Sequence, residues 1–500
     1  MQKNNSAIRV ALITGWASSG LIVGCVSVPN TPLPTTAIPD DWHNQPQAQT
    51  HKALPSDIHP CFAEQATPCA NRWWTVLQDD NLNAFVDSVM AHNRERKIAA
   101  LTVQKTQLTL DKDRQARGWV LSNTASLNRS GTHDLAEHTT QHSHNNSLGT
   151  TASWELDLWG KLADQQAISQ WEQHASIADQ QALYLSLSAN AVRSYFNLIN
   201  LNQRIDLAKA TLAHDQTLQK MLDIQLKAGK IAPIDKVTLA QSINQHQQNY
   251  QNLLNQKNEL LATMALAMGD NLGALSAKFP ALANVRPSNR PLPAMPIGLP
   301  AQVLANRPDI QTAVWRLKQA FAQADIAQKN LYPNIVLTAG ASTASPQLQQ
   351  LLKLPVLSWG LAVNLPPLNP KEAQRTLQTS DIATQQAVLI YQDTLYKALA
   401  DIEAKLSQYQ YQNSQRQLIE QNYQQSQQLL KANQLRYRAG SISLKQLLDA
   451  QEDSRQSLLS LADAHYQQKL AWINLNQALG GITLMYAEKN GEKTFGRLVP

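Results

Sequence analysis

The chain has 500 residues, of which 43% are hydrophobic and only 16% are charged. Soluble proteins average about 25% charged residues, so this composition excludes a highly charged disordered chain, and the 18 glycines exclude a collagen-like one. The formal net charge of +6 comes without a run of Lys or Arg, which argues against nucleic-acid binding. Three cysteines are too few for a disulfide scaffold.

Residues 1–24 are typical of a signal peptide. Lys3 and Arg9 form a positively charged start, and a mostly apolar segment follows up to Gly24. The segment ends in Leu-Ile-Val-Gly before Cys25, which resembles a bacterial lipobox. We therefore expect cleavage before Cys25 and a covalent lipid on its thiol, with sorting to the outer membrane. The alternative is an ordinary signal peptide with an incidental cysteine.

Residues 25–70 form a proline-rich N-terminal arm, in which long helices are not expected. Cys61 and Cys69 lie in this arm. In an exported chain the two thiols can form a disulfide, and two free thiols are the alternative. A metal site is not expected here.

The rest of the chain reads as two similar halves, residues 71–279 and 301–481, joined by a Pro-rich linker at 280–300 and followed by a tail at 482–500. Short motifs recur in the same order in both halves. Ser-Trp at 153–154 returns at 358–359, and Ala-Gly at 228–229 returns at 439–440. Each half predicts a helix, two strands, a long helix, a tight turn and a second long helix.

The predicted strands alternate in polarity. In residues 151–158, Ala152, Trp154, Leu156 and Leu158 alternate with polar side chains, and residues 357–365 repeat the pattern. Residues 120–128 and 335–341 alternate more weakly. One apolar and one wet face over about 9–11 residues is typical of outer-membrane strands. A half-buried strand of a soluble sheet gives the same alternation, but the export signal favours the membrane.

Residues 131–147, between the first two strands, are expected to form an extracellular loop. They contain four histidines, His133, His138, His142 and His144, so metal binding is the alternative. Trp119, Trp154, Trp159 and Trp359 lie near strand ends or on the apolar face. They predict an interfacial aromatic girdle, with simple strand packing as the alternative.

Residues 161–227 contain neither Pro nor Gly, which predicts one helix of about 100 Å. Apolar residues from Ala182 to Ile199 recur at alternating steps of three and four, and those from Val388 to Tyr409 also recur at steps of three or four, with a mean spacing of 3.5 in that stretch. This periodicity is typical of coiled-coil packing and excludes Gln-rich disorder. Such helices must pack along other long helices.

Four strands cannot close a barrel, because an open edge in lipid leaves backbone groups unpaired. A membrane sheet of this chain would therefore need several copies.

Together, the motifs resemble an outer-membrane efflux channel of the TolC superfamily, in its NodT-type lipoprotein branch. The resemblance covers nearly all of residues 71–481 and rests on these segments: Trp73-Trp74, Ser153 to Lys161, Ala228-Gly229 with Asp235, Leu304 to Ile310, Tyr332-Pro333, and Arg436 to Gly440 with Leu447 to Gln451. Pro366 to Pro370 departs from the family pattern and leaves the turn after the last strand open.

The resemblance implies an α+β membrane protein that works as a homotrimer. Four strands per chain would form a 12-stranded β-barrel in contact with outer-membrane lipid, and the long coiled-coil-like helices would form a helical barrel across the periplasm. A periplasmic adaptor protein and an inner-membrane pump, often of the resistance-nodulation-division class, would be its partners.

The resemblance also assigns roles at the helix–Gly–helix turns. Gly229 and Gly440 would mark the periplasmic tips that dock the adaptor, although two ordinary hairpin turns would look alike. Asp449 would form a ring of three carboxylates at the gate, while Tyr437 and Arg438 would hold the closed tip. An exposed helix aspartate is the alternative for Asp449.

The chain carries no recognisable catalytic motif, so we do not expect an enzyme, a metal or a cofactor beyond the lipid on Cys25. The leading hypothesis is a passive outer-membrane channel of a tripartite efflux pump that exports drugs, toxic compounds or metal ions. The alternatives are the channel of a type I protein secretion system and a periplasmic coiled-coil scaffold lipoprotein.

Overall fold

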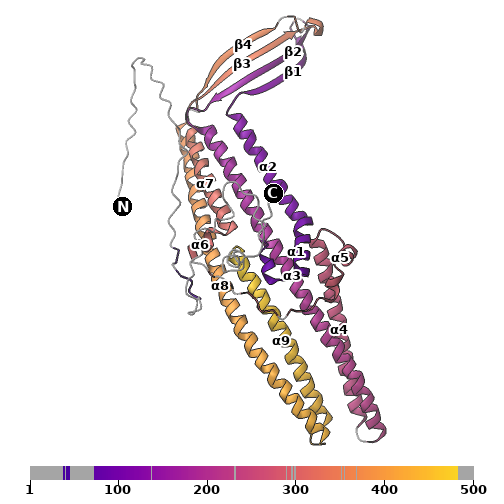
Figure 1. Cartoon of the computed structure of the whole chain (residues 1–500). Coiled ribbons are helices and arrows are strands. Elements are labelled where there is room, and N and C mark those ends of the chain that lie inside the picture. Colours follow the sequence, from indigo (N-terminus) through magenta and orange to yellow (C-terminus); the bar gives the residue numbers. More distant parts are fainter. Residues whose placement is uncertain are drawn as a thin grey trace.

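The structure is a computed structural model that describes residues 38–39, 41–44, 72–136, 138–229, 232–288, 290–293, 295, 297, 300–350, 352–353, 355–366 and 369–481. The predicted signal peptide, Cys25, Cys61, Cys69 and the tail at 482–500 lie outside these residues. The described part is elongated, with a sheet at one end and two helical turns at the other (Figure 1).

The sheet is an antiparallel meander of four strands in the order β1-β2-β3-β4. The strands are β1 (Val120–Asp134), β2 (Thr139–Leu156), β3 (Asn334–Ser345) and β4 (Val356–Asn364). The β2–β3 ladder joins the two halves of the chain. Among the described residues, β1 and β4 each pair on one side only. The four predicted strands are confirmed, and the sheet has two open edges.

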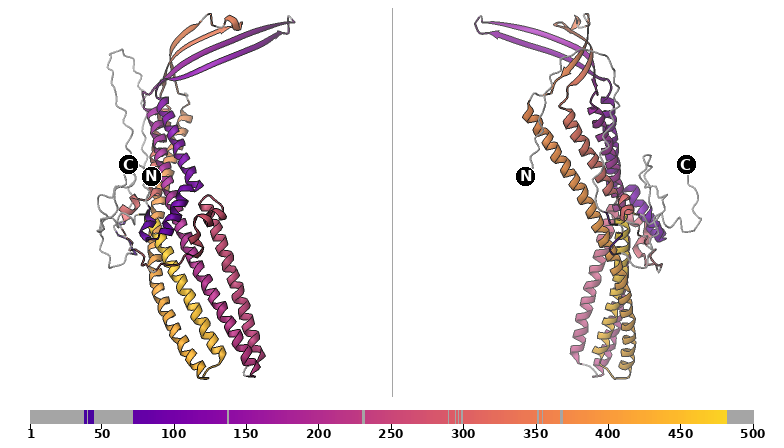
Figure 2. Two further views of the ribbon diagram at one scale, coloured as in Figure 1. Left: turned by 45° about the vertical axis from the view of Figure 1, so that its right-hand side comes forward. Right: turned by 90° about the vertical axis from the view of Figure 1, so that its left-hand side faces the viewer.

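The loop predicted for residues 131–147 is wrong. β1 and β2 remain paired out to Asp134 and Thr139, and only a short turn connects them. Hydroxyl groups hydrogen-bond across this ladder at 2.7 Å, between Ser126 and Ser147 and between Ser130 and Ser143. Cross-strand pairs of this kind stabilise a sheet without apolar side chains. The hairpin projects to one side of the helices (Figure 2).

Next to the sheet, four helices lie side by side in the order α2 (Arg94–Ala116), α3 (Lys161–Lys227), α7 (Pro308–Lys329) and α8 (Pro370–Arg438). α2 leads into β1 and α8 follows β4, so the order of the helices repeats that of the strands. Nearer the turns, the order is α4 (Pro233–Ala267), α3, α9 (Leu444–Ala478) and α8. The described chain is thus one layer of helices, edged by α8 on one side.

The helix predicted for residues 161–227 is confirmed as α3. Asp157 caps its first turn, because its carboxylate accepts hydrogen bonds from the backbone N–H groups of Leu162 and Ala163 at 2.9 and 2.8 Å. α8 begins at Pro370 after Asn369, whose side chain caps the backbone N–H of Glu372. Both helices end just before a glycine, at Gly229 and Gly440.

The main hydrophobic core lies at the middle of the long axis, where short elements cover the layer. These elements are η1 (Trp73–Leu77), α1 (Asp80–His92), α5 (Leu272–Lys278), η2 (Pro280–Asn284) and α6 (Pro300–Ala305); η3 (Leu348–Gln350) lies in the β3–β4 connection. Trp73, Trp74 and Trp472 are buried there with residues of α3 and α8. The indole N–H of Trp73 donates to Ser188 Oγ at 2.9 Å, and that of Trp472 to the carbonyl of Pro293 at 2.9 Å.

Three smaller clusters lie apart from this core. One joins α7 to α8 around Leu317 and Leu395. Another joins α3 to α4 around Ile205 and Leu253. The third, around Leu222, lies nearer the turns. Apolar packing is therefore distributed along the molecule.

The N-terminal arm contacts the body in its described part. Trp42 is buried in the main core, and the backbone N–H groups of His43 and Asn44 donate to the carboxylate of Glu403 on α8 at 2.7 and 3.2 Å. The arm thus lies against an edge helix.

Candidate functional site

Near the base of the sheet, one face is apolar on β2, β3 and β4. The register places Ala152, Ala339 and Trp359 in one row, and Trp154, Leu337 and Leu361 in the next. Trp359 is 91% exposed and Leu357 is 82% exposed. Strand periodicity of two puts these side chains on the same side. A contiguous exposed apolar surface of this kind needs a partner or a membrane.

The opposite face of the sheet carries small and polar side chains. The same ladders align Thr151, Gly340 and Ser358, and in the next row Ser153, Thr338 and Gly360. The sheet therefore separates an apolar side from a side that water can wet.

The aromatic residues predicted for a girdle fall at two levels. Trp119 contacts Trp154 with ring centroids 5.6 Å apart, and Trp159 contacts Tyr332 at 5.1 Å, both at the base of the sheet. Their indoles are held by the backbone, because Trp154 donates to the Arg117 carbonyl and Trp159 to that of Pro333. The register places Trp359 one step further out.

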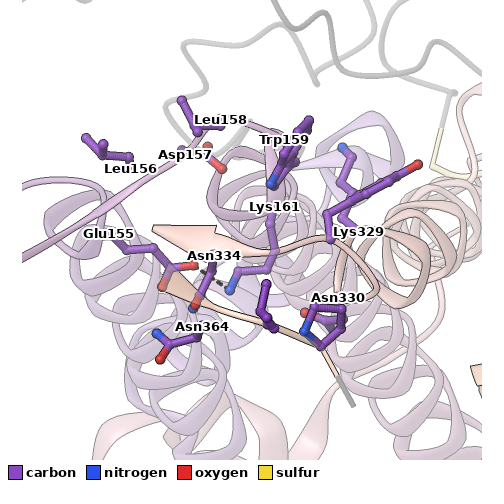
Figure 3. A pocket seen from close by; sticks show the side chains of 13 residues that line it. Glu155, Leu156, Asp157, Leu158, Trp159, Lys161, Lys329, Asn330, Asn334 and Asn364 are labelled. Atoms are coloured by element: carbon purple, nitrogen blue, oxygen red, sulfur yellow. Dashed lines mark ion pairs between the residues drawn. The ribbon is translucent and has the colours of Figure 1, made fainter. Parts of the chain in front are cut away.

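The base of the sheet contains a polar cavity of about 220 Å3 (Figure 3). Lys161 Nζ lies 2.6 Å from Glu155 Oε1, and the two residues bridge the end of β2 and the start of α3. Lys329 of α7 pairs with the buried Asp164 of α3. Burial, with a contribution from Asp164, raises the pKa of Asp325. The Glu155–Lys161 pair therefore joins β2 to α3, and the Lys329–Asp164 pair joins α7 to α3.

The motif from Leu304 to Ile310 joins three helices. The Arg307 guanidinium contacts Asp309 Oδ2 at 2.7 Å and Asp401 Oδ2 of α8 at 3.2 Å. It also donates to the Ala478 carbonyl at the end of α9 at 2.9 Å. Arg307 therefore joins the start of α7 to α8 and to the end of α9.

At the far end, the two turns have the same backbone geometry. Gly229 and Gly440 have φ of +67° and +73°, and a Cβ at either residue would meet no heavy atom within 4 Å. At the second turn, the N–H of Ser441 donates to the Arg436 carbonyl and that of Gly440 to Tyr437, both at 2.9 Å. Left-handed backbone, and not crowding, requires glycine here.

The three predicted gate residues lie at the second turn but are not joined by a contact. Asp449 is exposed on α9 between the half-buried Leu448 and the buried Ala450. Arg438 is exposed in the last turn of α8. The Tyr437 hydroxyl accepts a hydrogen bond from Gln225 Nε2 of α3 at 3.3 Å. This tyrosine therefore links the helical hairpin of α8 and α9 to the helical hairpin of α3 and α4.

A second link between the hairpins was not predicted. His246 of α4 contacts Asp215 of α3 through Nδ1 at 2.7 Å, and its Nε2 lies 3.8 Å from Glu452 of α9. Next to it, His214 Nε2 lies 2.9 Å from Gln451 Oε1. The sequence does not predict these pairs, because their residues lie on three separate helices. They meet only because α3, α4 and α9 pack side by side at this height.

Within the ranges that the structure describes, no three His, Cys, Asp or Glu side chains are grouped to hold a metal. In the same ranges, no single helix is both long and apolar enough to cross a membrane. By length and composition alone, the bent pair formed by Pro233–Ala267 and Leu272–Lys278 passes that test.

Comparison with known proteins identifies the class. The family described as "Outer membrane efflux protein" matches residues 86–270 and 299–481, so the chain belongs to this family. It is an outer-membrane channel of an efflux system.

Among its relatives is the "Cation efflux system protein CusC" of Escherichia coli O6:H1 strain CFT073, which is 28% identical over 82% of this chain and 88% of CusC. The "Probable outer membrane lipoprotein SilC" of Salmonella typhimurium is 25% identical over 83% of this chain and 90% of SilC. In structure, the Campylobacter jejuni CmeC outer membrane channel matches with a TM-score of 0.77 at 20% identity, over 91% of this chain and 94% of CmeC. At 20% identity, this structural match shows a shared fold alone.

Proposed function

We propose that three copies of the chain close one twelve-stranded barrel, with the apolar face toward lipid and the polar face toward a water-filled pore. The observation that carries this proposal is the two-faced sheet whose edge strands, β1 and β4, each pair on one side only among the described residues. A sheet in lipid must close, and three times four strands is within the range of known barrels.

The helices support the same closure. The edge helices α2, α4 and α8 all carry large apolar side chains that are more than half exposed, namely Ile98, Leu101 and Leu108 on α2, Ile234 and Val237 on α4, and Leu389, Ile390, Leu418 and Leu435 on α8. In a ring of copies, α8 of one chain would cover α2 and α4 of the next. The helical layer then becomes a barrel that continues the pore.

In this assembly Cys25 carries a covalent lipid, and Cys61 with Cys69 form a disulfide in the arm. The turns at Gly229 and Gly440 are the periplasmic tips, where an adaptor protein docks. An inner-membrane pump of the resistance-nodulation-division class supplies the energy. The channel is passive and has no catalytic role. The relatives CusC, a cation efflux system protein, and SilC, a probable outer membrane lipoprotein, support a lipoprotein channel for small solutes such as metal cations.

Whole-cell accumulation tests this function. A strain lacking the gene is compared with the same strain carrying it back, using a panel of dyes, antibiotics and metal ions. We expect higher accumulation of particular compounds without the gene, reversed by its return. Equal accumulation of every compound, with altered secreted proteins, would instead indicate type I protein secretion.

A further inference from the structure

We propose that His246 is a positioning residue that holds the two helical hairpins together near the tips when its imidazole ring is protonated. The first hairpin is α3 with α4, and the second is α8 with α9. The inference rests on the proposed function, in which the tips form the periplasmic end of the channel. A change in the aperture there can move one hairpin of a chain relative to the other.

His246 lies between one carboxylate of each hairpin. Its Nδ1 is 2.7 Å from Asp215 Oδ2, in the same hairpin, and its Nε2 is 3.8 Å from Glu452 Oε2, in the other. The side chain of His246 is 21% exposed and that of Asp215 is 7% exposed. A mostly buried carboxylate and a short contact fix which ring nitrogen faces which hairpin.

The side chains next to the two carboxylates come from α3 and α9. From α9, Arg455 Nε lies 2.7 Å from Glu452 Oε2, and this hydrogen bond is the main cause that lowers the pKa of Glu452. His214 of α3 contacts the neutral Gln451. Toward the tips, Leu448 of α9 packs against the cluster formed by Leu218, Leu222 and Leu239, so apolar contact already brings the hairpins together. The acidic groups in contact with His246 are Asp215 and Glu452, and Arg455 pairs with Glu452.

The sign of the effect follows from the two nitrogens. A neutral imidazole has one N–H and one lone pair. With Nδ1–H donated to Asp215, the neutral ring presents its Nε2 lone pair to the Glu452 carboxylate, which is unfavourable. Protonation replaces this lone pair by an N–H and a positive charge, and the contact between hairpins becomes attractive.

Consequently, the link between the hairpins strengthens as the pH falls, because low pH favours the protonated imidazole. Raising the pH removes the attraction, and the hairpins separate more easily. Because Glu452 is about half exposed, we expect a modest effect, about two- to fivefold in the equilibrium between joined and separated tips.

The test is single-channel recording of the full-length protein in planar lipid bilayers between about pH 5.5 and 8. We expect the open fraction of the wild type to rise about two- to fivefold with pH. His246→Gln, which is uncharged at every pH, should lose this rise, and Glu452→Gln should reduce it. His214→Gln is the matched control, because it removes the adjacent histidine that faces a neutral partner. It should keep the rise.

A His246→Gln variant with the wild-type pH profile would overturn the inference, and so would a His214→Gln variant that alone loses it. A wild-type protein that conducts with no pH dependence would also contradict it. A wild-type protein that forms no pores would contradict the proposed channel itself. Assembly of each variant is checked on gels, where the assembled protein migrates differently before and after heating. A variant that keeps this heat-dependent shift is still assembled.

Discussion

Asp449 stands at the end of the molecule where a narrow pore would be most sensitive to charge. It is exposed on α9, while Leu447 and Ala450 beside it are buried, so its carboxylate faces away from the helix contacts. Three such carboxylates around one axis would attract cations and disfavour anions.

Asp449→Asn should therefore lower the permeability of the channel to cations relative to anions, with little change in folding. The measurement is the reversal potential of single channels under a salt gradient. Asp393→Asn serves as the control, since Asp393 is an exposed aspartate of α8 paired with Lys397. If Asp449→Asn leaves the reversal potential unchanged, Asp449 does not belong to the gate.

Residues at the turns differ in how far the sequence predicts them. A glycine after a long apolar-periodic helix indicates a left-handed turn, and Gly229 and Gly440 adopt that backbone. The contact between His246 and Glu452 has no such local signal, because the two residues belong to different hairpins. Their meeting depends on side-chain packing between α3, α4 and α9.

At the scale of elements, β4 shows most directly how the two faces of the sheet differ. Leu361 and Ala362 are neighbours in the chain, and both are exposed. Leu361 lies in the apolar row with Leu337, whereas Ala362 pairs with Val336 on the other face. Lipid on one face and water on the other would make these positions respond differently to charge.

Leu361→Lys should modestly reduce the amount of assembled protein in the outer membrane, because Leu361 shares its row with Trp154 at the base of the sheet, and a lysine facing lipid costs up to about 1 kcal/mol near an interface. Ala362→Lys, one residue along the same strand, should be tolerated. The readout is the heat-modifiable band in purified outer membranes. An equal loss of assembled protein for both variants would mean that the two faces of the sheet lie in similar environments.

Elements were predictable where one simple pattern decides them. Residues 161–227 lack helix breakers, and α3 has the predicted bounds. Alternation of large apolar residues likewise located the ends of β2 and β4. The outer part of β1 and β2 was missed because hydroxyl pairs such as Ser130 with Ser143 hold it together. Apolar periodicity carries no information about such a ladder.

At the scale of the whole molecule, two separate features hold the protein at the membrane in the proposed assembly. One is the lipid on Cys25, and the other is the apolar face of the closed sheet. Several acyl chains on one cysteine anchor a protein stably, and a spanning barrel would hold the chain in the membrane independently of them.

Cys25→Ser should therefore remove the lipid mass from the mature chain, as intact mass spectrometry would show. The assembled fraction should still require detergent for extraction. Release of the variant by an alkaline wash would show that the lipid alone anchors the chain, as expected for a periplasmic scaffold lipoprotein. A wild-type sample treated in the same way is the control.

The separation of the hydrophobic clusters along the axis has a consequence for how the protein unfolds. The main core around Trp73 and Trp472 lies at the middle, and the cluster around Leu222 lies well below it on the same continuous helix α3. Separate clusters act as separate cooperative units, so the tips can open locally while the middle stays intact. Amide hydrogens at the tips should thus exchange with solvent well before those of the central core. A substitution that destabilises the tips should leave the central core folded.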